Sequence, residues 1–363
     1  MNQASPAEQL AQFAAQFWRF QCTEFPLAAV LAGEATPDAI LFREAPADHE
    51  RRDRAAGVML AQLDGISADP LTGQDRATHR LLRGELEDLR ALHQVLAHLR
   101  PALLPVGPDF AAMQFANMAA IDGKESAERY LDRLATLPAF VHDLQSCLQA
   151  GHDRGIRYPR VVLEGATATV RATTSGPTES LAWQGPFQRS VAAADESMRR
   201  CAERAQALIR DELLPAWRGY ADFLSGPLAV GARSTIACTD APMGREFYQA
   251  QLRHYTTTAM PADEIHQLGL AEIARLDAET AAVAAQAGYP NDVRGYRAFL
   301  ASDPQFIASS KEALLEQAES LAKRIDKKIP ALFGRIPRMT YGIECMPESL
   351  AAHMPAAYAQ PNP

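Results

Sequence analysis

The sequence predicts an all-α protein, mostly helical and with at most a small β-element. Apolar residues recur at three- and four-residue spacing along most of the 363 residues, whereas strand-like alternation is scarce. Hydrophobic residues make up 47% of the chain and charged residues 22%, which is typical of a globular protein. We expect one helical domain over residues 1–363, with a candidate sub-boundary in a loop at 164–188.

The first predicted helix carries an aromatic stripe, formed by Leu10, Phe13, Phe17 and Phe20. This spacing places the four side chains on one face, which we expect to pack on the core. The helix should end at Phe25-Pro26, because the residue before a proline disfavours helical backbone angles.

A second long stripe of leucines lies between Thr78 and Arg100 and is expected to stop at Pro101 and Pro105. Its members are Leu82, Leu86, Leu89, Leu92 or alternatively His93, Leu96 and Leu99.

Further amphipathic segments predict helices at about 125–150, 190–224, 245–257, 261–287, 293–301 and 309–328. The best candidates for extended structure are Arg160–Leu163, Thr167–Arg171 and Met339–Cys345. Two stretches read as long loops, namely 101–121, which contains three prolines, and 164–188, which is rich in Gly, Ser and Thr. Loops of that length are often functional, although a plain connection is an equally good explanation.

Composition argues against several classes of protein. The net charge is -8, whereas a protein that follows nucleic-acid phosphates normally has a basic face. No apolar run approaches the roughly 20 residues that span a bilayer, and the start, MNQASPAEQL, has no signal-like basic and apolar regions. The five cysteines are scattered without a C-x-x-C pair, which favours reduced thiols. We therefore expect a cytoplasmic protein with no nucleic-acid or membrane partner.

Strong catalytic motifs are absent from the sequence. It contains no G-x-S-x-G, no phosphate-binding glycine loop and no H-E-x-x-H. His93 and His98 are five residues apart, about 140° around a continuous helix, so we expect that they cannot bind one ion from a single face. The sequence therefore predicts no metal site and no catalytic residue within this chain.

The stretch HYTTTAMPADEIHQLGL, from His254 to Leu270, combines two histidines with two acids but has a structural explanation. Pro261 is favoured at the first helical position, and the acids that follow complement the helix dipole. His254 and His266 should therefore lie on different elements. The new helix should bury a stripe made of Ile265, Leu268, Ile273, Leu276 and Val283.

A family resemblance is carried by a series of segments that spans nearly the whole chain. They are Phe17-Trp18, Phe25-Pro26 and Gly33; Leu214–Trp217, Tyr220 and Phe223-Leu224; Pro242–Tyr248, Leu252-Arg253 and Thr256-Thr257; Pro261–Leu270; and Leu332–Gly334, Ile336-Pro337, Tyr341-Gly342 and Pro347. Together they resemble the bacterial domain-of-unknown-function 885 family. One departure is Met260, where the family usually has a threonine that caps the following helix, a change expected to cost about 1 kcal/mol unless Thr257 or Thr258 substitutes.

The resemblance implies a helical fold similar to the zinc metallopeptidases of the thermolysin and neurolysin type. Members typically carry H-E-x-x-P-G-H-H, which supplies metal ligands and a general base, in a continuation beyond the region that matches Tyr341–Tyr358. No residue of this chain matches that motif, so no ligand or base is carried over. Zinc is expected only if a C-terminal part is present. The chain is then a truncated N-terminal portion, half of an assembly, or a relative that has lost the catalytic part.

Three functional hypotheses follow. In the first, the chain forms one wall of the substrate cleft of a zinc-dependent peptidase or carboxypeptidase and is inactive alone, with Tyr248, His254, Tyr341 and Tyr358 as cleft-lining candidates. In the second, it is a non-enzymatic module that pairs with a C-terminal half, a partner protein or itself. In the third, a histidine and carboxylates from distant helices form an active site that a single sequence does not reveal.

Overall fold

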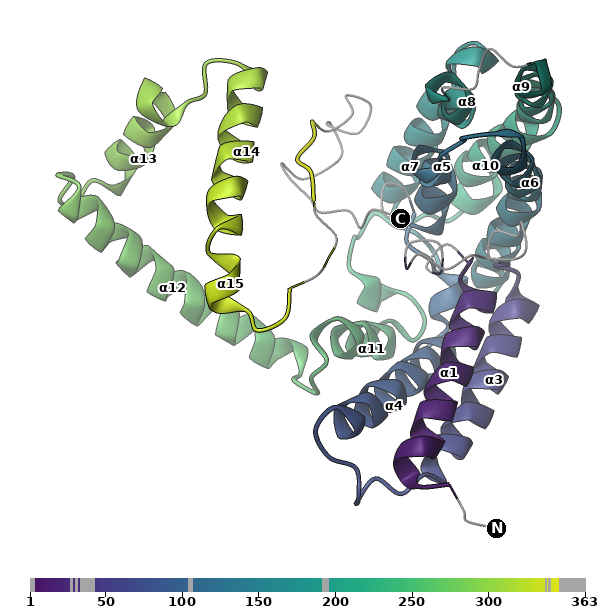
Figure 1. Ribbon diagram of the computed structural model, residues 1–363, viewed down its shortest axis with the longest axis horizontal. Helices are drawn as coiled ribbons and strands as arrows, with labels where there is room; N and C mark the ends of the chain where they lie inside the picture. The colour runs from purple at the N-terminus through teal and green to yellow at the C-terminus, as the bar shows by residue number, and fades with distance from the viewer. Residues whose placement is uncertain are drawn as a thin grey trace. The chain divides into compact units, whose positions relative to one another are not determined.

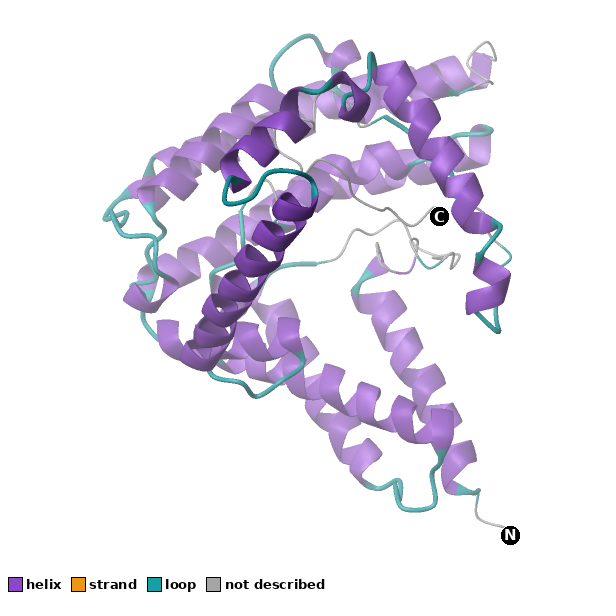
Figure 2. Cartoon of the chain, turned by 90° about the vertical axis from the view of Figure 1, so that its left-hand side faces the viewer, coloured by secondary structure: helices purple, strands orange, loops and turns teal. Residues whose placement is uncertain are grey.

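The computed structural model describes residues 4–26, 29, 32, 43–103, 107–190, 196–336, 338 and 341–345. Within these residues all regular structure is helical, apart from one isolated parallel bridge between Pro159 and Arg233 (Figure 2). The predicted all-α class is confirmed, and this bridge is its small β-element.

The chain divides into two compact units, Met1–Ala259 and Met260–Gln360, where one domain was expected. The segment 164–188, expected to be a loop with a candidate sub-boundary, lies inside the first unit. There it contains most of the helix Arg160–Thr173, two short 3-10 helices and most of the short helix Gly185–Arg189.

The first unit begins with α1 (Pro6–Glu24), α3 (Pro46–Asp64) and α4 (Gly73–Gln94), which pack on one another (Figure 1). The aromatic stripe faces this small core as predicted: Leu10 and Phe13 are buried, and Phe17 and Phe20 pack against its edge. Leu82 and Leu86 of α4 complete it. A residue in the left-handed conformation, Leu96, then turns the chain into a short 3-10 helix, Ala97–Leu99.

The larger core of the first unit lies among the helices that follow. They are α5 (Pro108–Met118), α6 (Lys124–Asp153), α7 (Arg160–Thr173), α8 (Gly185–Arg189), α9 (Glu196–Leu208) and α10 (Leu214–Ser225). A π-helical turn, Ile209–Leu213, joins α9 to α10, and α11 (Gly244–Thr256) ends the unit. The fully buried side chains include Phe140, Trp217 and Tyr220.

Two of the predicted strands are wrong, because Arg160–Leu163 and Thr167–Arg171 both belong to α7. Leu163, Ala166, Thr167 and Val170 are the buried residues of that helix, and their spacing is helical. The β-branched residues of this segment suggested extended backbone, but packing against α10 decides the outcome. The predicted loop at 101–121 likewise contains α5.

The second unit contains α12 (Ala262–Gln286), α13 (Val293–Ser302), α14 (Lys311–Asp326) and the short α15 (Ile329–Leu332). Pro261 is the N-cap residue of α12 and Ala262 its first helical residue, so Pro261 lies one position earlier than predicted and Met260 is not the capping residue. The helix begins within one residue of the predicted start, but the predicted buried stripe is wrong: Ile265 is partly exposed, and Leu268, Ile273, Leu276 and Val283 are each at least half exposed. Residues 341–345 have no regular structure, whereas residues 339 and 340 of the third predicted strand lie outside the described residues.

Candidate functional site

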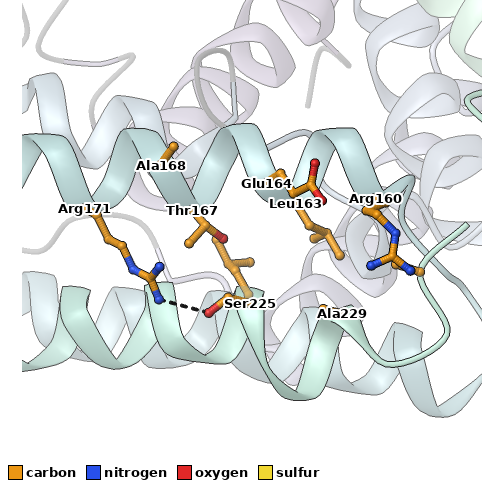
Figure 3. Close-up of a pocket in the computed structure, with 10 residues that line it drawn as sticks. Arg160, Leu163, Glu164, Thr167, Ala168, Arg171, Ser225 and Ala229 are labelled. Atoms are coloured by element: carbon orange, nitrogen blue, oxygen red, sulfur yellow. Dashed lines mark hydrogen bonds between the residues drawn. The ribbon is translucent and has the colours of Figure 1, made fainter. Parts of the chain in front are cut away.

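The candidate site is a surface groove of about 290 Å³ between α7 and α10 (Figure 3). Its floor is apolar, formed by Leu163 and Leu224 with Ala229 and Ala232 from the segment after α10. Arginines lie at both ends, Arg160 and Arg171, and Glu164, Thr167 and Ala168 lie between them on the same helix. The groove is therefore apolar at its base and charged at its rim.

Helix geometry explains why the two arginines share this groove. Arg160 and Arg171 are 11 residues apart, which is about three turns, so they lie on one face roughly 16 Å apart along the axis. Leu163 and Thr167 fall on the same side and are buried against α10. The amphipathic pattern of α7 thus sets a line of charges beside an apolar seam.

The charged groups of the groove differ in their partners. Arg171 donates hydrogen bonds to Asp222 Oδ1 at 3.3 Å and to Ser225 Oγ at 3.2 Å, which fixes one end of the groove. Within the described chain, the guanidinium of Arg160 and the carboxylate of Glu164 have no hydrogen-bond or ion-pair partner. Figure 3 shows the Glu164 carboxylate turned away from α10 and the Thr167 side chain directed toward it. The hydroxyl of Thr167 is buried without a hydrogen-bond partner.

A second cluster, the histidine stack, was missed by the sequence analysis. The rings of His93 and His98 are stacked with centroids 4.5 Å apart, and the ring of His49 stacks on His98 at 5.0 Å. The predicted separation of His93 from His98 assumed one continuous helix. The helix instead ends at Gln94, and the left-handed turn at Leu96 folds His98 back onto His93.

The stack does not fit a zinc ion. The lone pairs of an imidazole lie in the plane of its ring, and the planes of His93 and His98 are within 8° of parallel. Lone pairs in parallel planes do not converge on one tetrahedral centre. Over the residues that the structure describes, no three His, Cys, Asp or Glu side chains are placed to hold a metal ion.

Each outer histidine of the stack faces an acid. His49 Nε2 lies 2.9 Å from Glu44 Oε2, and His93 Nδ1 lies 3.8 Å from Asp53 Oδ2. His98 lies between the two rings, and its Nδ1 is buried without a hydrogen-bond partner. Burial, together with the charges of His49, His93 and Arg154, lowers the pKa of His98 to about 3, so it is neutral at physiological pH.

Two of the cleft-lining candidates lie on α11. Tyr248 is exposed, and His254 Nδ1 is 3.7 Å from Asp88 Oδ2 of α4 while its ring packs edge-on against Tyr255. Because these residues are six apart on a helix, they point about 120° from each other. The structure does not bring Tyr248 and His254 together in one site.

The other two candidates lie near the end of the chain. Tyr341, in the second unit, is exposed and donates hydrogen bonds to Asp326 Oδ1 at 3.1 Å and to the Ala322 carbonyl at 3.4 Å. Tyr358 lies outside the described residues. Of the candidates that the structure describes, Tyr248, His254 and Tyr341 do not line the groove between α7 and α10.

The fold and the sequence together define a class of helical bacterial proteins. The sequence matches the family described as bacterial protein of unknown function (DUF885) over residues 26–363. The chain belongs to this family. No curated protein matches it.

A solved structure, that of a candidate lipoprotein from Colwellia psychrerythraea, has the same fold. The TM-score is 0.82 at 18% sequence identity, with 97% of this chain and 64% of that chain covered. The chain thus spans less than two thirds of the length of that relative. None of the described helices is both long enough and apolar enough to cross a membrane.

Proposed function

We propose that the protein is the helical portion of a zinc-dependent peptidase-like or carboxypeptidase-like assembly, where it forms a wall of the substrate cleft and does not hydrolyse peptides alone. The chemical class rests on the ordered resemblance of its segments to a family whose members typically carry a zinc motif. Because no described set of side chains fits zinc, we assign no metal ligand and no catalytic residue to this part of the chain.

One observation supports the need for a further polypeptide. Among the described residues of the second unit, one hydrophobic residue, Ala284, is buried. Helices α12 and α14 instead expose apolar side chains along their length. The exposed residues are Leu268, Leu270, Ile273, Leu276 and Val283 on α12, and Leu314, Leu321 and Ile325 on α14. Apolar surface on this scale commonly marks an interface. We propose that its occupant is a segment equivalent to the part of the longer solved relative that this chain does not cover.

Activity measurements test the enzymatic side of the proposal. Purified protein would be incubated with zinc and a panel of peptides, with a chelator-treated sample as the control. We expect no zinc-dependent hydrolysis above that control. Robust hydrolysis by this chain alone would contradict the proposal.

A non-enzymatic binding module is the second candidate, and the same exposed faces of α12 and α14 favour it. Light scattering separates a self-associating chain from one that needs a different partner. A monomer that stays soluble at high concentration and binds no apolar dye would count against self-association and against binding of a different partner through these faces.

A hidden active site receives no support from the groove, which carries one carboxylate, that of Glu164, and no histidine. A cytoplasmic location remains a prediction from the sequence. The solved relative is named as a candidate lipoprotein, so cell fractionation is the direct test of location for this chain.

A further inference from the structure

We propose that the groove between α7 and α10 binds a small amphiphilic anion, a carboxylate on a short aliphatic body. The carboxylate would pair with Arg160, and the aliphatic part would lie on Leu163, Leu224 and Ala229. The lining of this groove does not include Tyr248 or His254, and the proposal does not depend on a peptidase function.

The size of the groove limits the ligand. A volume of about 290 Å³ is near the lower end of the range for small-molecule sites. It equals the share of roughly ten water molecules in the liquid, so it suits a ligand of about ten non-hydrogen atoms.

The negative charge proposed for the ligand follows from the partners of the charged side chains in the groove. Arg171 is already engaged by Asp222 and Ser225, whereas the Arg160 guanidinium has no described partner and lies at an apolar floor. A guanidinium presents a planar fork of donors that matches a carboxylate, and such charge-assisted pairs are the stronger hydrogen bonds. Glu164 would oppose an anion, but its carboxylate is turned away from α10 (Figure 3).

Two sources present this chemistry, a free aliphatic acid and the C-terminus of a peptide that ends in an apolar residue. Titration calorimetry with hexanoate and with N-acetylleucine separates them by affinity. Hexanol and N-acetylleucinamide are the uncharged analogues. We expect saturable binding of at least one of the two acids and none of its uncharged analogue.

Two groove variants give opposite expectations. Arg160→Gln should weaken binding about tenfold or more, because the charged donor is lost. Glu164→Gln should tighten binding a few-fold, because a like charge is removed. Arg199→Gln is the matched control, since Arg199 is an exposed arginine on α9 that pairs with Glu196 outside the groove.

Circular dichroism of each variant verifies that the fold is retained. Three results would overturn the proposal: no saturable binding of either acid at millimolar concentration, equal binding of the uncharged analogues, or equal affinities of the wild-type protein and Arg160→Gln. Peptide hydrolysis by the chain would contradict the proposed function and leave this inference standing.

Discussion

His98 is a histidine whose ionisation the fold opposes. It lies between His49 and His93, with Arg154 nearby, and Glu44 and Asp53 face the outer rings rather than His98 itself. Its pKa is lowered to about 3 in the folded chain, whereas an unfolded histidine titrates near 6.5. Between these values the unfolded chain binds the extra proton, so this residue destabilises the fold progressively as pH falls from about 6.5 to about 3.

Replacement of His98 with glutamine should therefore reduce the loss of stability on acidification. Urea midpoints at about pH 7.5 and about pH 5 would be compared for the wild-type protein and the variant. His142→Gln is the control, because His142 is an exposed histidine on α6. We expect a smaller decrease for His98→Gln and an unchanged one for His142→Gln. An equal decrease in all three proteins would show that His98 does not contribute.

At the level of single residues, the sequence predicted the burial of apolar side chains in the first unit better than it predicted contacts between polar side chains. Leu10 and Phe13 are buried because a helical period aligns them, and that period is local information. The stack of His93 on His98 depends on one left-handed residue, Leu96, and leucine carries no sequence signal for that conformation. The third ring, from His49, arrives from a different helix, α3.

Among the elements, α1 has a complete capping box that can be tested directly. Ser5 Oγ accepts a hydrogen bond from the Glu8 amide at 3.3 Å, and the Ser5 amide donates to Glu8 Oε2 at 2.8 Å. Ser5→Ala removes the side-chain acceptor and should lower the free energy of unfolding by about 1 kcal/mol. Urea unfolding followed by circular dichroism measures this loss. Gln12→Ala, an exposed change within the same helix, should alter stability by less than about 0.5 kcal/mol, and an equal effect of both changes would contradict the capping role.

Most helices were predictable as elements, whereas their surroundings were not. The segments at 125–150, 245–257, 293–301 and 309–328 match α6, α11, α13 and α14 to within a few residues. The failure at α7 arose because β-branched residues and glycine lower helical propensity, while the buried face that overrides it involves α10, some 50 residues later. The groove could not be predicted for the same reason, because four of its ten lining residues come from α10 and the segment that follows it.

For the whole molecule, the two units differ sharply in buried apolar surface. The first contains a large core built around Phe140, Trp217 and Tyr220, whereas the described part of the second unit has the single buried hydrophobic residue Ala284. A helix whose apolar side is exposed depends on its own hydrogen bonds, which confer only marginal stability in water. Hydrophobic periodicity predicted α12 correctly, but the burial expected of its apolar side is wrong, because periodicity is local and does not show which other element covers that side.

Hydrogen exchange followed by mass spectrometry on the full chain tests this difference. Amides of α6 and α10 should exchange slowest, because their opening requires disruption of the large core, and amides of α12 and α14 should exchange much faster. Trp217→Ala should destabilise that core by about 3–5 kcal/mol and speed exchange in α6 and α10. The same substitution should leave the exchange rates in α12 and α14 unchanged if the second unit opens independently.

The opposite outcome is protection of α12 amides equal to that of α6 amides, which would show that the apolar side of α12 is covered in solution. Light scattering on the same sample would then tell whether a second copy of the chain covers it.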